Sequence, residues 1–105
     1  MSIRKMISLH PKASGNPALG DAVHHLMYCA KMCASCADAC MAEKMDMAQS
    51  IRLCLDCSDI CEATARLGLR QTGDDQPMLR GLLELCAQIC RECAEDCRKA
   101  AASLV

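Results

Sequence analysis

Large aromatic side chains are almost absent from this sequence of 105 residues. It contains no phenylalanine and no tryptophan, and its one tyrosine is Tyr28. Aromatic rings normally supply much of the buried surface of a small domain. A core built from Cys, Ala and Leu alone is thin for its size, so we expect bound metal or association between subunits to stabilise the fold.

An excess of one sign of charge is also missing, because 12 Lys and Arg are balanced by 13 Asp and Glu. This balance gives no indication of binding to nucleic acid or to an anionic membrane. No apolar stretch approaches the length of a membrane span, and the first residues do not resemble a signal peptide. We therefore expect one domain over residues 1–105, in the cytoplasm, with neither nucleic acid nor a membrane as a partner.

Cysteine, in contrast, is abundant, with eleven residues in three groups. Within each group the spacing alternates between steps of three and four residues. Such steps keep side chains on one face of a helix, so each group predicts a helix with thiols where Leu and Ile would normally lie. The groups are Cys29, Cys33, Cys36 and Cys40; Cys54, Cys57 and Cys61; and Cys86, Cys90, Cys93 and Cys97.

The pattern predicts an all-α fold, an antiparallel bundle of three long helices after a short N-terminal segment, with a core lined by cysteine. Asn16 followed by Pro17 is typical of a helix start, and Gln76 before Pro77 starts the third helix in a similar way. Asp46 with a glutamine three residues on resembles a capping box. Turns are expected around residue 45 and within 71–75. The three helices are expected at about 17–43, 46–70 and 76–102.

Folding these helices back on one another places the cysteines in layers. A turn near residue 45 pairs the first helix with the second, and a turn between residues 73 and 74 pairs the second with the third. Helices packed about 8–10 Å apart would bring the thiols of one layer within reach of a shared ion. The expected layers are Cys29–Cys61–Cys86, Cys33–Cys57–Cys90, Cys36–Cys54–Cys93 and Cys40–Ser50–Cys97.

Metal binding explains these layers better than three other interpretations. Cysteine can be a small buried hydrophobe, but chance would not place eleven in register. A disulfide framework conflicts with the odd count, with the one-faced spacing and with a reducing compartment. A thiol redox protein remains an alternative, although redox Cys-x-x-Cys pairs are usually exposed at a helix N-terminus.

The arrangement also favours one metal. Zinc and iron–sulfur sites gather four ligands at one point, so a helical interaction or structural module with one or two zinc ions or a cluster is the second alternative. Cu(I) is soft, prefers thiolate sulfur and accepts two or three ligands, so a face of thiols can hold several ions in a row. We therefore predict a non-enzymatic protein that stores or sequesters several Cu(I) ions, with all eleven cysteines as ligands.

Four further residues are candidates for an auxiliary role in metal binding. Met41, Met45 and Met47 cluster near Cys40, at an end of the bundle where copper could enter, and His25 lies one turn before the first cysteine group. Methionine more often fills gaps in a core, and histidine is more often solvated or part of a helix cap.

A second apolar stripe lies off the cysteine faces of the second and third helices. A monomeric three-helix bundle would not need it, so it indicates another helix or another subunit, and we expect a homo-oligomer, either a dimer or a tetramer. The stripe consists of Ile51, Leu55, Ile60, Leu82, Leu85 and Ile89.

Five stretches carry a resemblance to a known family: Met6–Ser8 with His10–Pro11, Cys36–Cys40, Ser50–Leu53, Asp56–Cys61 and Cys86–Cys97. In these stretches the sequence resembles the bacterial copper storage proteins, in particular their cytosolic branch. The resemblance implies a four-helix bundle whose thiol-lined core binds many Cu(I) ions, tetramers, and a role in storage or detoxification. A fourth long helix, usual in that family, is not evident after Cys97, and Leu26 and Ser50 stand where cysteine is often found. We therefore expect a lower capacity per chain, and a fourth wall supplied by a partner subunit or the N-terminal segment, or missing altogether.

Overall fold

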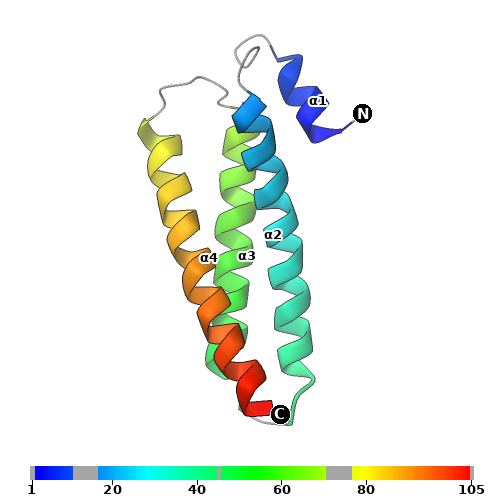
Figure 1. The fold of residues 1–105 in the computed structure, drawn as a ribbon, viewed down its shortest axis with the longest axis vertical. Coiled ribbons are helices and arrows are strands. Elements are labelled where there is room, and N and C mark those ends of the chain that lie inside the picture. The colour runs from blue at the N-terminus through cyan, green and yellow to red at the C-terminus, as the bar shows by residue number, and fades with distance from the viewer. Residues whose placement is uncertain (1, 11–16, 45, 71–76, 105) are drawn as a thin grey trace.

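The computed structural model describes residues 2–10, 17–44, 46–70 and 77–104, and these residues form helices and short turns. The elements in chain order are α1 (Ile3–Ser8), α2 (Pro17–Met41), α3 (Ala48–Arg70) and α4 (Pro77–Leu104). No strand occurs in the described ranges. The predicted all-α bundle, with three long helices after a short N-terminal segment, is confirmed (Figure 1).

The start of α2 at Pro17 and the end of α3 at Arg70 agree with the expected ends, and the other helix ends differ by one or two residues. α2 ends at Met41, and α3 begins at Ala48 rather than near residue 46. Asp46 lies just outside the helix because its Oδ1 accepts a hydrogen bond from the backbone N–H of Ala48 at 3.1 Å. The expected starts at Asn16 and Gln76, and the expected turn at 71–75, lie outside the described residues.

The short helix α1 packs against α2 at one end of the bundle (Figure 1). Ser2 caps it, since its Oγ accepts a hydrogen bond from the N–H of Lys5 at 3.1 Å. Arg4 pairs with Asp21 of α2, with 2.6 Å between Nε and Oδ1. Ile7 is buried, whereas Met6 is half exposed.

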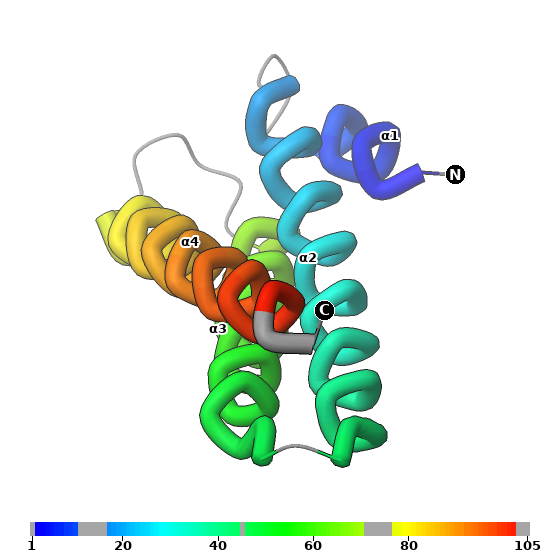
Figure 2. The backbone as a smooth tube through the Cα atoms, turned by 60° about the horizontal axis from the view of Figure 1, so that its bottom comes forward, coloured from blue at the N-terminus to red at the C-terminus, as the bar shows by residue number. Residues whose placement is uncertain are grey.

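The long helices form an antiparallel pair with a third helix laid across it. α2 and α3 run side by side and pack along their length, and α4 packs mainly against α3. Figure 1 and Figure 2 show the start of α4, in yellow, far from α2, while its C-terminal end, in red, swings toward α2. The bundle is therefore more open between α2 and α4 than on its other sides.

The core has two chemically different parts. Near α1 it is aliphatic, where buried Ile7, Leu19, Val23, Ala65 and Leu79 pack together. We name this part the aliphatic cap. The rest of the core, toward the α2–α3 turn, consists of the cysteines with small alanines between them. The aliphatic cap closes one end of the bundle, so the thiol-lined part lies between this cap and the α2–α3 turn.

Two hydroxyl groups of α3 find hydrogen-bond partners within the bundle. The hydroxyl of buried Thr64 donates to the carbonyl oxygen of Ile60 at 2.7 Å, and the hydroxyl of Ser58 donates to the carbonyl oxygen of Ala30 at 2.8 Å. The second of these bonds ties α3 to α2. Such bonds remove the cost of burying a hydroxyl group.

In the described part of the chain, none of the helices has both the length and the apolar character needed to cross a lipid bilayer.

Candidate metal centre

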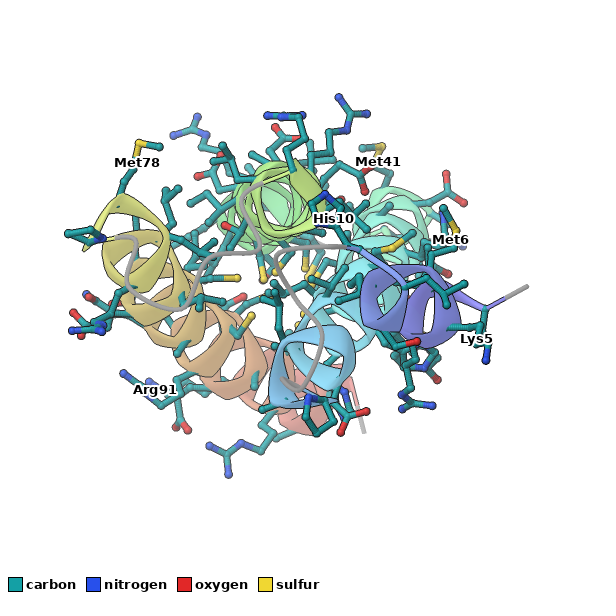
Figure 3. All side chains as sticks on the ribbon, turned by 90° about the horizontal axis from the view of Figure 1, so that it is seen from above. Lys5, Met6, His10, Met41, Met78 and Arg91 are labelled. Carbon is teal, nitrogen blue, oxygen red and sulfur yellow. The ribbon has the colours of Figure 1, made fainter. Side chains whose placement is uncertain are left out.

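All eleven cysteines are free thiols, and they gather where the three long helices meet. Viewed from above, many sulfur atoms lie between the helices, while the labelled Met6, Met41 and Met78 lie at the outside (Figure 3). Six thiols are buried, and three of them, Cys54, Cys57 and Cys61 on α3, have no exposed surface. The predicted helical spacing therefore places the thiols inside the bundle.

The largest group, which we name the four-thiol cluster, contains Cys29, Cys57, Cys61 and Cys90. Its Sγ atoms all lie within 4.8 Å of one another. The Sγ of Cys90 lies 3.5 Å from that of Cys29, 3.6 Å from that of Cys57 and 3.5 Å from that of Cys61. One ligand thus comes from α2, two from α3 and one from α4.

Two three-thiol clusters continue the array toward the α2–α3 turn. Each takes one cysteine from each long helix, and its sulfur atoms also lie within 4.8 Å of one another. The sulfurs of Cys54 and Cys93, which belong to different clusters, are 3.6 Å apart, and Cys57 belongs to two clusters. The array is therefore continuous. The two clusters are Cys33–Cys57–Cys93 and Cys36–Cys54–Cys97.

Two cysteines lie at the margins of the array, outside the three clusters found among the described residues. Cys86 adjoins the four-thiol cluster, since its Sγ is 3.2 Å from that of Cys61. Cys40 is half-buried at the other end of the array, next to Cys36. Each of these two thiols therefore extends the array at one of its ends.

The clusters correct one part of the predicted layering. The α2–α3 pairs Cys29–Cys61, Cys33–Cys57 and Cys36–Cys54 lie together in the clusters as expected, and Cys57–Cys90 is one of the expected α3–α4 contacts. The α2–α4 pairs are wrong by about one turn. Cys29 contacts Cys90 rather than Cys86, and Cys36 contacts Cys97 rather than Cys93. The shift arises because α4 crosses the α2–α3 pair at an angle, as packed helices usually do.

Burial dominates the electrostatics of these thiols. It raises the pKa of Cys33 and of Cys97 to about 12, from an ordinary value of 9.0. It also raises the pKa values of Cys54, Cys57 and Cys61, and the neighbouring thiols raise them further. A buried thiolate is disfavoured because it loses its water without gaining a positive partner. These five thiols are therefore protonated at neutral pH when no metal is bound.

The auxiliary candidates occupy different positions. Met41 is 56 % exposed and lies at the outside of the bundle (Figure 3). Met47 is buried and lines a cavity of about 160 Å³ together with Cys36, Cys40 and Cys97. His25 donates a hydrogen bond from its Nδ1–H to the carbonyl oxygen of Asp21, at 2.9 Å. Met45 lies outside the described residues.

A groove of about 400 Å³ runs between α2 and α4 on the open side of the bundle. Its walls are almost entirely apolar, and half-buried Cys29 and Cys90 lie in it beside buried Cys86. Helical periodicity located the thiols but did not reveal this groove, because the groove depends on the tilt of α4. The groove is lined by Ala22, His25, Leu26, Tyr28, Cys29, Leu83, Cys86, Ala87 and Cys90.

Among solved structures, the chain is similar to the copper storage protein Ccsp from Streptomyces lividans, in a form loaded with 10 copper equivalents. The TM-score is 0.86 and the identity 32 %, over 96 % of this chain and 80 % of that one.

Among curated proteins, the chain is 33 % identical over 73 residues to YhjQ, an uncharacterised cysteine-rich protein of Bacillus subtilis (strain 168). This match covers 68 % of the chain but only 64 % of YhjQ. The family model described as copper storage protein matches residues 16–104. The chain therefore belongs to the copper storage protein family, in agreement with the resemblance of its cysteine pattern.

Proposed function

We propose that this protein stores or sequesters several Cu(I) ions per chain, with the eleven thiols as ligands. The observation that carries the proposal is the continuity of the array. Two of the three clusters share Cys57, and the third touches its neighbour through the sulfurs of Cys54 and Cys93. Cu(I) is the soft ion that fits three-thiol clusters of this kind. The ions are the cargo of the protein, and each one is held by sulfurs from different helices.

Storage also accounts for the chemistry of the core. The three thiols of α3 are buried and protonated, which is unsuitable for a nucleophile that must reach a substrate. Copper binding would displace protons and cross-link helices that otherwise pack through small side chains. We therefore propose a protein without enzymatic activity. The small cavity beside Met47 and Cys40 supports entry of copper at the α2–α3 turn.

The proposal is tested by titrating the fully reduced protein with Cu(I) under anaerobic conditions, against a coloured competing chelator. We expect several ions to bind tightly to each chain, and native mass spectrometry to follow the loading. Binding of a single ion per chain would contradict storage. A matched variant in which all four cysteines of α4 are replaced by serine should lose most of this capacity.

We further propose that the protein acts in the cytoplasm. Eleven free thiols with sulfur atoms as close as 3.2 Å would be exposed to oxidation in an oxidising compartment. The reducing cytoplasm keeps such thiols available for metal. Cell fractionation, with detection of the untagged protein, should recover it in the cytoplasmic fraction, and recovery outside the cell would contradict this assignment.

The groove between α2 and α4 supports a homo-oligomer, either a dimer or a tetramer. It leaves apolar Leu26 and Leu83 beside exposed Tyr28 on the side where Cys29 and Cys90 lie. A second copy would cover these groups and complete the wall around the thiols.

Sedimentation velocity over a range of concentrations tests this association. We expect Tyr28→Glu to weaken it. Met78→Glu, a change at an exposed residue that does not line the groove, is the control. A wild-type monomer at every concentration, both copper-free and copper-loaded, would contradict it.

A further inference from the structure

The four-thiol cluster differs from the other two clusters in its number of ligands. A tetrahedral zinc site with Zn–S bonds of about 2.3 Å places its sulfur atoms about 3.8 Å apart. Four of the six sulfur separations in the cluster are 3.5, 3.5, 3.6 and 4.0 Å, and the remaining two are within 4.8 Å. The four thiols are thus close to the arrangement of a four-thiolate site before any ion binds.

The helices hold these four ligands in place. Cys57 and Cys61 lie one turn apart on the same face of α3, with their sulfurs 4.0 Å apart. Cys29 and Cys90 reach the same point from α2 and α4. Ligands on rigid helices keep their geometry better than ligands on loops, so little rearrangement is needed to bind an ion.

The position of the cluster gives a bound ion a structural effect. α2 packs against α3, and α4 packs against α3, while packing between α2 and α4 is sparse. An ion held by Cys29, Cys90 and the two α3 thiols would connect all three helices at the groove. Binding of an ion to a folded site of this kind stabilises the fold.

We propose that the four-thiol cluster binds one tetrahedral divalent ion of the zinc class when copper is scarce, and that this ion braces α2 against α3 and α4. This inference goes beyond copper storage. The three-thiol clusters offer one ligand fewer and are suited to Cu(I), whereas four thiolates match the preference of zinc. Four protons leave to solvent as zinc binds. Cu(I) then takes over the same thiolates, and zinc returns to solution.

The test uses Co²⁺ as a spectroscopic probe of the reduced, copper-free protein under anaerobic conditions. We expect one Co²⁺ per chain, with the intense visible d–d bands and sulfur-to-cobalt charge transfer of a tetrahedral four-thiolate site. One equivalent of Zn²⁺ should remove these bands. Addition of Cu(I) should then release the zinc to a zinc-sensitive dye.

Two variants on the same helix make the assignment specific. Cys90→Ser removes a ligand of the four-thiol cluster, and Cys93→Ser removes a ligand of a three-thiol cluster one turn further along α4. We expect Cys90→Ser to lose the four-thiolate spectrum and Cys93→Ser to keep it. Cys29→Ser, on α2, should behave like Cys90→Ser, and circular dichroism shows whether each variant is folded.

A second measurement tests whether the bound ion stabilises the fold. Zn²⁺ should raise the melting temperature of the wild type and of Cys93→Ser, and should leave that of Cys90→Ser unchanged. A three-thiolate spectrum, equal loss in both α4 variants, or no zinc effect on melting would overturn the inference. Since the copper titration is a separate measurement, failure of the zinc site alone would leave the storage proposal standing.

Discussion

The thiol of Cys57 occupies a special position, because it is fully buried and belongs to two clusters at once. Burial raises its pKa, with neighbouring Cys33 and Cys90 adding to the effect, so it carries a proton in the copper-free protein. A protonated, inaccessible thiol reacts slowly with oxidants and alkylating agents. A metal ion that reaches the core can still displace the proton, so the same burial protects the site and leaves it able to bind metal.

Replacement of this shared thiol should lower the number of bound Cu(I) ions more than replacement of a marginal thiol. Cys57→Ser removes a sulfur from two clusters, whereas Cys40→Ser removes a half-buried thiol that lies in none of the three clusters. We expect Cys57→Ser to lower the number of tightly bound Cu(I) ions at least twice as much as Cys40→Ser. The measurement is an anaerobic titration against a chelator, read at equal protein concentration.

A folding control is needed for this pair. A serine hydroxyl buried without a partner lowers the free energy of unfolding by about 1–3 kcal/mol, so Cys57→Ser should unfold earlier in urea than the wild type. Circular dichroism before the titration shows whether the helices are intact. Equal losses of copper in two folded variants would show that the shared position of Cys57 does not matter.

At the scale of the helices, the antiparallel pairing could be predicted, but the crossing of α4 could not. The spacing of Cys29, Cys33 and Cys36 against Cys61, Cys57 and Cys54 defines the α2–α3 register once a short turn is assumed. Pairing residues of neighbouring helices by their distance along the chain from the turn treats the helices as straight, parallel rods. Because α4 crosses at an angle that depends on side-chain packing, its contacts with α2 are shifted by about one turn. The contacts between Cys29 and Cys90, and between Cys36 and Cys97, show this shift.

Two glycines test how tightly the helices pack. A Cβ at Gly68 of α3 would lie 2.9 Å from Cγ2 of buried Val23 on α2, whereas a Cβ at Gly81 of α4 meets nothing within 4 Å. Gly81→Ala should stabilise the protein by about 0.5–1 kcal/mol, since alanine favours helix over glycine. Gly68→Ala should destabilise it by about 1 kcal/mol, because the clash outweighs the same gain.

Urea denaturation of the reduced, copper-free protein measures both changes. The two substitutions are chemically identical and both lie inside long helices, so each is the control for the other. If Gly68→Ala stabilised the protein as much as Gly81→Ala, α2 and α3 would have room to separate at the aliphatic cap, and the close contact with Val23 would not limit their packing.

At the scale of the whole molecule, the residue types of the candidate site could be predicted, but only part of their grouping could. Steps of three and four residues showed that the thiols share one face of each helix. The union of Cys29, Cys57, Cys61 and Cys90 in one cluster depends on the tilt of α4, as does the groove beside Tyr28. These features arise from contacts between distant parts of the chain, which periodicity within a single helix does not contain.

The buried thiols make the stability of the whole copper-free molecule depend on pH. In the unfolded chain they ionise near the ordinary pKa of 9.0, whereas burial raises the pKa of Cys33 and of Cys97 to about 12 in the folded chain, and raises that of Cys57 as well. Above pH 9 the unfolded chain therefore binds fewer protons than the folded one. The free energy of unfolding must then fall as the pH rises, and the contribution of these thiols is complete only below pH 9.

Urea denaturation of the reduced, copper-free protein at pH values from 7 to 11 should show this fall beginning near pH 9. Each thiol that stays protonated contributes at most about 1.4 kcal/mol per pH unit to the slope. Cys57→Ala is the matched comparison, since it removes one fully buried thiol and leaves the other titrating groups in place, so its slope should be shallower. A wild-type stability that is flat across this range would mean that the core thiols ionise as easily inside the bundle as in water, and that the bundle does not exclude water from its thiol array.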